Sequence, residues 1–165
     1  MTESLMNEIQ PILHEYLVYL QQHPDGEEIQ YRTALENLVK GLSLPEQNIK
    51  IIQEDRHSGT GVEGVPDFFV YENYGTPAKT LKGFIECKKP SYKLDKLIES
   101  QQIKNYSKTC ENIILTNYHR FILLQKGKII HHIELTDAPT DILDFGTLLR
   151  DFYEYEYPFI KTKKH

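Results

Sequence analysis

The sequence predicts an α/β fold, with a central mixed β-sheet flanked by helices. Two N-terminal segments carry apolar residues at helical spacing, several short runs rich in Ile, Val, Phe and Tyr follow, and a helical segment closes the chain. At 165 residues and 39% hydrophobic content, the chain can form one domain with a real core. Its 11 Tyr and 7 Phe residues argue against disorder.

The predicted elements follow in the order ααβββαβββα. Helical spacing of apolar residues occurs in residues 3–21, 27–42, 92–109 and 141–153. Pro11, inside the first of these segments, predicts a kink or a helix start near that residue. Strands are predicted at residues 48–54, 65–72, 80–89, 111–117, 120–128 and 129–135.

The chain is expected to be a single domain in residues 1–155, followed by a basic tail in residues 156–165 that could link it to a further domain. No apolar run approaches the ~20 residues needed to span a bilayer. The acidic N-terminus lacks the apolar region of a signal peptide. Cys87 and Cys110 lack the spacing of a disulfide framework, so a cytoplasmic location is expected.

The charge distribution bears on nucleic-acid binding. A net charge of −5 is unusual for a protein that binds phosphates, which attract Lys and Arg. The lysines are concentrated, however, in one stretch that contains Lys79, Lys82, Lys88, Lys89, Lys93 and Lys96. Clustered carboxylates that bind a metal would account for part of the acidity.

Three polar residues interrupt the apolar strands. Asp67 begins one strand, and Glu86 and Lys88 occupy positions i and i+2 of a later one. Residues two apart in a strand point to the same face, so Ile85 and Cys87 should point into the core on the other side. Charges buried at a sheet require partners.

A divalent metal would supply that partner. Asp67 and Glu86 could bind Mg²⁺, for which Mn²⁺ would substitute, with the backbone carbonyl of Cys87 as a further ligand. The metal would activate a water and stabilise the leaving oxygen. Lys88 could orient or deprotonate that water, or stabilise the pentacoordinate phosphate.

These residues resemble the PD-(D/E)XK nuclease superfamily, because Pro66-Asp67 matches its PD and Glu86-Cys87-Lys88 its E-x-K. Gln102 and Tyr106 match the Q-x-x-x-Y pattern of the RecB-like and Mrr-like branches. The resemblance implies a restriction-endonuclease-like core. It implies that Gln102 positions the attacking water or Lys88, with Tyr106 packed or hydrogen-bonded beneath it. Leu94, Ile98, Gln102 and Tyr106 are spaced four apart and should form one helical stripe.

Many members of that superfamily also carry a glutamate on the first core helix, and Glu36 is the candidate for it here. The phrases GVPDFFV, GFIECKKPS and NYSKTCENIILTNYHRFILL resemble the N-terminal nuclease domains of type IIG and type ISP restriction–modification enzymes and of type I restriction motor subunits. This resemblance covers roughly residues 27–135. In those enzymes methyltransferase, helicase or specificity domains follow on a longer chain.

The resulting hypothesis is a Mg²⁺-dependent DNA endonuclease, the cleavage domain of a restriction enzyme. Asp67, Glu86, Lys88 and Gln102 would be catalytic, and Lys89, Lys93 and Tyr106 would contact DNA. One site cuts one strand, so two copies would be needed for a double-strand break.

Two alternatives stay open: a catalytically silent nuclease-fold module that binds DNA or a partner protein, and a nuclease acting on junctions or RNA. Asp67 as a turn cap and Glu86–Lys88 as a surface ion pair are the simpler structural interpretations. His57, in the Gly-rich segment HSGTGVEG, is expected on a surface loop that shapes the DNA groove. His131 and His132 are adjacent on a strand, point to opposite faces and cannot ligate one metal together.

Overall fold

A computed structural model describes residues 3–42, 48–53 and 65–156 of the chain. The helices are α1 (Glu3–Gln22), α2 (Glu28–Gly41), α3 (Asp95–Ile98), α4 (Gln101–Ser107) and α5 (Pro139–Tyr153). The strands are β1 (Lys50–Gln53), β2 (Phe68–Glu72), β3 (Thr80–Cys87), β4 (Asn112–Thr116), β5 (Arg120–Gln125) and β6 (Lys128–Glu134). His57 and its Gly-rich segment, and the basic tail beyond residue 156, lie outside the described residues.

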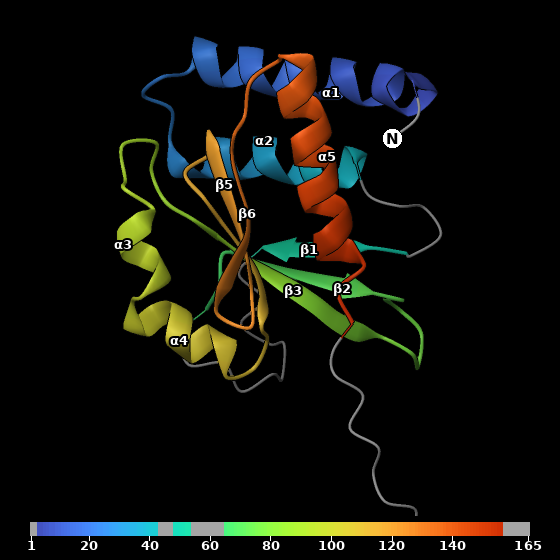
Figure 1. Cartoon of the computed structure of the whole chain (residues 1–165), viewed down its shortest axis with the longest axis vertical. Helices are drawn as coiled ribbons and strands as arrows, with labels where there is room; N and C mark the ends of the chain where they lie inside the picture. The colour runs from blue at the N-terminus through green and yellow to red at the C-terminus, as the bar shows by residue number, and fades with distance from the viewer. Residues whose placement is uncertain (1–2, 43–47, 54–64, 157–165) are drawn as a thin grey trace, which may run out of the picture.

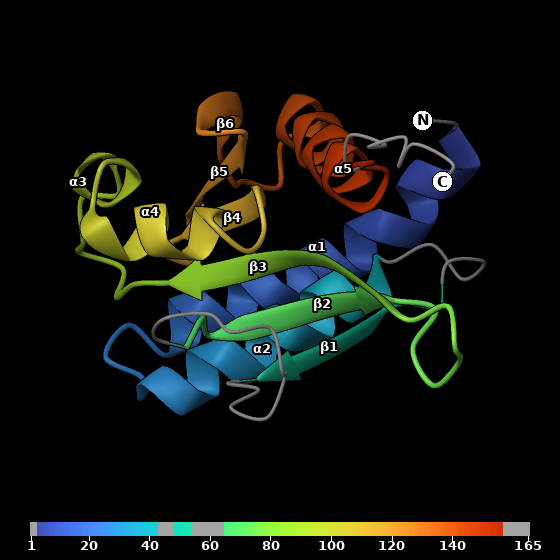
Figure 2. The ribbon, with the colours of Figure 1, turned by 90° about the horizontal axis from the view of Figure 1, so that it is seen from below.

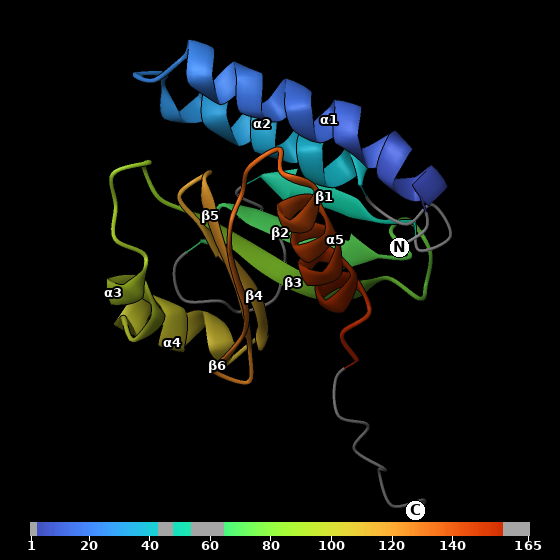
Figure 3. The same ribbon diagram turned by 45° about the horizontal axis from the view of Figure 1, so that its top comes forward.

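The strands form a six-stranded sheet in the order β1-β2-β3-β4-β5-β6. Only the β3–β4 pair is parallel among these strands, and α3 and α4 make the crossover between them. The other neighbours are antiparallel. Helices α1, α2 and α5 pack on one face and α3 and α4 on the other, with the strands between them (Figures 1 and 3). The predicted α/β fold with a mixed sheet flanked by helices is confirmed.

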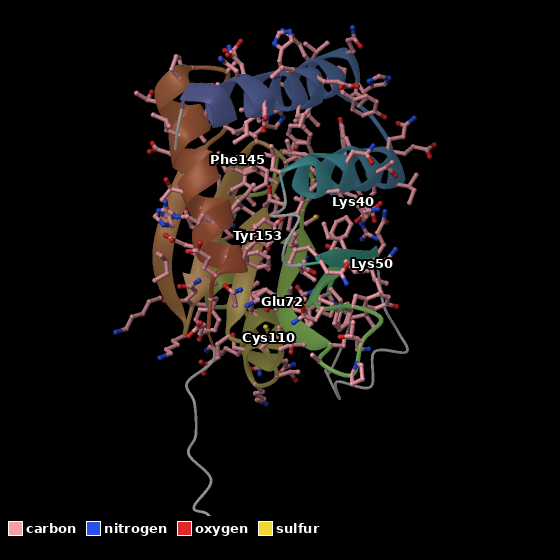
Figure 4. All side chains as sticks on the ribbon, turned by 90° about the vertical axis from the view of Figure 1, so that its right-hand side faces the viewer. Lys40, Lys50, Glu72, Cys110, Phe145 and Tyr153 are labelled. Atoms are coloured by element: carbon pink, nitrogen blue, oxygen red, sulfur yellow. The ribbon has the colours of Figure 1, made fainter. Side chains whose placement is uncertain are left out.

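Each face of the sheet has its own apolar core, because neighbouring strand residues alternate between faces. Ile85 and Cys87 of β3 pack with α1, α2 and α5, as their alternation with Glu86 predicts. Phe84 packs instead with α3 and α4. Figure 4 shows Phe145 and Tyr153 pointing from α5 into the interior, where the Tyr153 hydroxyl donates to the Val39 carbonyl at 3.0 Å.

The two N-terminal helices lie side by side across the sheet, behind β1, β2 and β3 in Figure 2. α1 continues through Pro11, so the alternative prediction that the helix starts near this residue is wrong. Pro11 is exposed, so water can reach the carbonyl that its missing N–H leaves free. α2 begins with a capping box in which the Glu27 backbone N–H donates to the Gln30 side chain at 3.0 Å.

The segment 92–109 forms two short helices rather than the one that its apolar spacing predicts. Ser100 is the N-cap of α4, and its hydroxyl accepts from the Ile103 backbone N–H at 3.3 Å. The single stripe predicted through Leu94 and Ile98 is therefore wrong. None of the helices in the described ranges combines the length and apolar character that crossing a bilayer requires.

Candidate active site

The carboxyl groups of Asp67 and Glu86 meet at the end of the β2–β3 pair. Phe68 of β2 lies opposite Ile85 of β3, and the antiparallel register places Asp67 opposite Glu86. The Asp67 backbone N–H donates to Glu86 Oε1 at 3.3 Å, and the Cys87 backbone N–H donates to Asp67 Oδ2 at 2.6 Å. Two acidic side chains nineteen residues apart thus converge because of strand pairing.

Both carboxyl groups are withdrawn from water, with Asp67 7% and Glu86 3% exposed. Burial and the adjacent Asp67 carboxylate raise the pKa of Glu86 from its ordinary 4.5 to about 8, although Lys88 opposes the rise. Burial also raises the pKa of Asp67, against the Cys87 amide and the Arg32 guanidinium. Near neutral pH the Asp67–Glu86 pair therefore holds one proton, and a bound cation could displace it.

Lys88 and Gln102 surround the outer oxygen of Glu86. The Gln102 amide donates to Glu86 Oε2 at 2.8 Å, and Lys88 Nζ lies 3.7 Å from the same oxygen. Lys88 also donates to Gln102 Oε1 at 3.4 Å. Gln102 thus links Glu86 to Lys88. Glu86 is held by β3, Lys88 directly follows that strand, and Gln102 is held by α4.

Tyr106 supports Gln102 from beneath. The Gln102 amide donates to the Tyr106 hydroxyl at 2.9 Å, one helical turn away on α4. Burial raises the pKa of Tyr106 to about 12, with a contribution from Glu86, so the phenol stays protonated. At 1% exposure Tyr106 presents no surface to DNA, and the prediction that it contacts DNA is wrong.

Arg32 is a site residue that the sequence reasoning missed. Its side chain reaches from α2 to contact Asp67 Oδ1, and the same Nη2 atom lies 2.8 Å from Glu28 Oε1. The Arg32 side chain is 12% exposed, so this ion pair is shielded from solvent. An arginine one helical turn after Glu28 predicts the pair with Glu28. Nothing in the sequence indicates the pair with Asp67, because that contact depends on how α2 crosses the sheet.

An open pocket of about 800 Å³ contains these groups. Its lining includes Asp67, Glu86, Cys87, Lys88 and Gln102, with Arg32 and Glu28 from α2 and Lys89 and Tyr92 from the segment after β3. Cations therefore lie beside the carboxyl pair, as binding of a phosphate would require.

Two other predicted residues lie elsewhere. Glu36 does not line this pocket; it pairs with Lys40 at 3.0 Å on α2. Glu28, two turns nearer the start of α2, is the helix carboxylate that the fold brings to the site. Lys93 is exposed on the segment before α3 but outside the pocket lining.

The histidines of β6 serve other contacts. His131 pairs with Asp151 of α5 at 2.5 Å, and His132 accepts from Arg120 Nε at 3.1 Å. The two rings therefore engage different elements, as their alternation predicts.

The donor set suits a small, hard cation. Mg²⁺ is commonly held by one or two carboxylates, with water and substrate phosphate oxygens completing six positions. Asp67 and Glu86 meet that requirement, and no cluster of three or more His, Cys, Asp or Glu side chains suited to a metal occurs within the described ranges. Two close carboxyl groups that retain a proton are the electrostatic condition under which a divalent cation binds with proton release.

Comparison with known proteins gives a likeness of fold. No protein-family model and no curated protein matches the sequence. The structure of the chain is similar to part of a cryo-EM structure of a DrdV–DNA complex, with a TM-score of 0.66 over 95% of this chain and 21% sequence identity. This chain spans 14% of the length of that one.

Proposed function

We propose that this chain is a divalent-metal-dependent DNA endonuclease that hydrolyses phosphodiester bonds, in the manner of the cleavage domain of a restriction enzyme. One observation carries the proposal: Asp67 and Glu86 converge in one pocket, with Lys88 3.7 Å from the Glu86 carboxylate. The similarity in fold to a chain whose structure was determined as a complex with DNA supports nucleic acid as the partner.

Asp67 and Glu86 would hold Mg²⁺, with the Cys87 carbonyl as a third protein ligand. When bound, the metal lowers the pKa of a water and neutralises charge on the phosphate. Lys88 places an ammonium group where it can stabilise the additional negative charge of the pentacoordinate phosphate. Gln102 keeps Lys88 and Glu86 at fixed separation through its two hydrogen bonds.

The remaining part of the site would receive the DNA backbone. Lys89 lines the pocket and is exposed, so it can contact a phosphate beside the one that is cut. Lys93 would extend this contact along the strand. Binding should weaken as salt rises, because each neutralised phosphate releases counterions.

The test is cleavage of supercoiled plasmid at high protein concentration with Mg²⁺ or Mn²⁺. We expect nicked product from the wild type and about 100-fold slower nicking, or none, from Asp67→Asn and Lys88→Met. Lys128→Met, at an exposed lysine of β6 outside the pocket, is the matched control and should cleave normally. Cleavage that survives in both site variants would refute the proposal. If the wild type binds DNA and neither it nor the variants cleave it, the catalytically silent nuclease-fold module is favoured.

A further inference from the structure

Both oxygens of the Asp67 carboxylate have protein partners. Oδ2 accepts from the Cys87 backbone N–H at 2.6 Å, and Oδ1 contacts the Arg32 guanidinium. Arg32 also forms an ion pair with Glu28 at 2.8 Å, and the Glu28 side chain is 67% exposed. The cation nearest to Asp67 in this structure is therefore an arginine of the protein itself.

A guanidinium and a divalent cation have the same sign of charge and seek the same oxygen. If both remained close to Oδ1, their repulsion at a few ångströms in a partly desolvated pocket would oppose metal binding. Arg32 already stabilises the ionised form of Asp67, which is the work that a bound metal would do. Binding of a metal at Asp67 should therefore loosen or displace Arg32.

The displaced guanidinium has a destination in the same pocket. Arg32 lines the pocket together with Lys88 and Lys89, the other cations proposed to meet a nucleic-acid phosphate. A guanidinium binds phosphate oxygens in a two-pronged arrangement that lysine cannot reproduce. Glu28, largely exposed, can release Arg32 at little cost in solvation.

We propose that Arg32 is a positioning residue that holds Asp67 in the metal-free protein and transfers to a DNA phosphate when a divalent cation binds. The inference rests on the proposed function, because it takes Asp67 as a metal ligand and DNA as the substrate. The transfer couples the two ligands: metal binding frees Arg32 for DNA, and DNA binding frees Asp67 for the metal, so the two bind with positive cooperativity.

The coupling has two measurable consequences. Without DNA, replacing Arg32 by a neutral residue removes the competitor and should tighten metal binding by about 5- to 20-fold. With DNA, the wild type should bind metal about 5-fold or more tightly than without DNA, and the variant should lose most of that gain. A purely structural arginine would give the opposite first result, since its loss would disorder Asp67 and weaken metal binding.

The experiment is calorimetric titration of the whole chain with Ca²⁺, an oxygen-preferring cation, with and without a short DNA duplex. The proteins are wild type, Arg32→Gln, Arg32→Lys and Asp67→Asn. Arg120→Gln is the matched control, because Arg120 pairs with Asp95 at 3.7 Å away from the pocket. Circular dichroism establishes that each variant is folded.

Tighter Ca²⁺ binding by Arg32→Gln with a reduced effect of DNA supports the inference. Unchanged or weaker binding by a folded Arg32→Gln overturns it while leaving the metal site intact. If Arg32→Gln does not fold, Arg32→Lys decides, since a point charge on a flexible stem should compete less well and bind Ca²⁺ more tightly than wild type. Equal binding by Asp67→Asn and wild type would instead refute the proposed function.

Discussion

Replacing Glu86 by Gln should make the metal-free protein more stable at alkaline pH and slightly less stable at acidic pH. In the folded chain, burial and Asp67 raise the pKa of Glu86 to about 8. The folded state then retains a proton between about pH 4.5 and 8 that the unfolded state has released. Stability contributed by the protonated form is complete below the unfolded pKa and is lost as pH rises through the folded one.

The size of the effect follows from the two pKa values. A difference between 4.5 and about 8 corresponds to roughly 4–5 kcal/mol of stability lost across that range, at about 1.4 kcal/mol per pH unit. Gln has no charge to desolvate but cannot accept with both terminal atoms, so it loses one hydrogen bond of about 1–2 kcal/mol. The variant should therefore be about 1 kcal/mol less stable than wild type at pH 5 and about 2–3 kcal/mol more stable at pH 8.5.

The assay is urea unfolding of both proteins in EDTA at the two pH values, read by circular dichroism. Glu99→Gln, at an exposed glutamate between α3 and α4, is the control and should follow the wild type at both pH values. If wild type and Glu86→Gln lose stability in parallel between pH 5 and 8.5, the Glu86 carboxyl does not hold its proton in the folded state and the reasoning fails.

Three further predictions concern activity and packing. Lys88→Met should lower the rate of plasmid nicking by about 100-fold or more while Ca²⁺ binding is retained, and a nicking rate near that of wild type would contradict its role. Asn112→Ala should cost about 2–4 kcal/mol in urea unfolding, because the Asn112 amide donates to the buried carbonyls of Lys82 and Phe152 at 2.9 and 2.8 Å. Gly83→Ala should cost a similar ~2–4 kcal/mol, since its Cβ would lie 2.6 Å from the Asn112 carbonyl oxygen and 2.5 Å from a Phe152 ring carbon. An unchanged unfolding midpoint would contradict this expectation, because both the Asn112 backbone and the Phe152 ring would then have to shift at no cost.

The strands were predictable from local patterns, and the convergence of the two acids was expected from the match to the PD and E-x-K motifs. Runs of β-branched and aromatic residues separated by turn residues define β2 and β3, and their hairpin fixes an antiparallel register. The pairing next to the turn would place Asp67 opposite Ile85, and a register shift between Val70 and Tyr71 brings it opposite Glu86. The place of Gln102 was expected from the match of Gln102 and Tyr106 to the Q-x-x-x-Y pattern, and the hydrogen bond between them agrees with that spacing.

The contributions of α2 were not predictable in the same way. Glu28, Arg32 and Glu36 are spaced four apart, so all three lie near one face of the helix. Which of them reaches the pocket depends on where along its axis α2 crosses the sheet. Eight residues correspond to about 12 Å of helix, enough to take Glu36 out of the site.

The break at Ser100 was missed for a different reason. Apolar spacing through Leu94 and Ile98 continues across the break, since both short helices pack on the same face of the sheet. The capping hydrogen bond from Ile103 to Ser100 is local and weak, and Ser also occurs inside helices. Periodicity therefore indicated a helical region correctly but could not show that it is interrupted.

The most direct test of a metal site built by Asp67 and Glu86 is the proton released on metal binding. Titration of wild type with Mn²⁺ at pH 7 in two buffers of different ionisation enthalpy should show one bound cation and release of about one proton, because Glu86 with a pKa of about 8 must ionise to bind. Glu86→Gln should bind at least ten-fold more weakly and release no proton. Binding of Mn²⁺ by wild type without proton release, or undiminished binding by Glu86→Gln, would contradict the account.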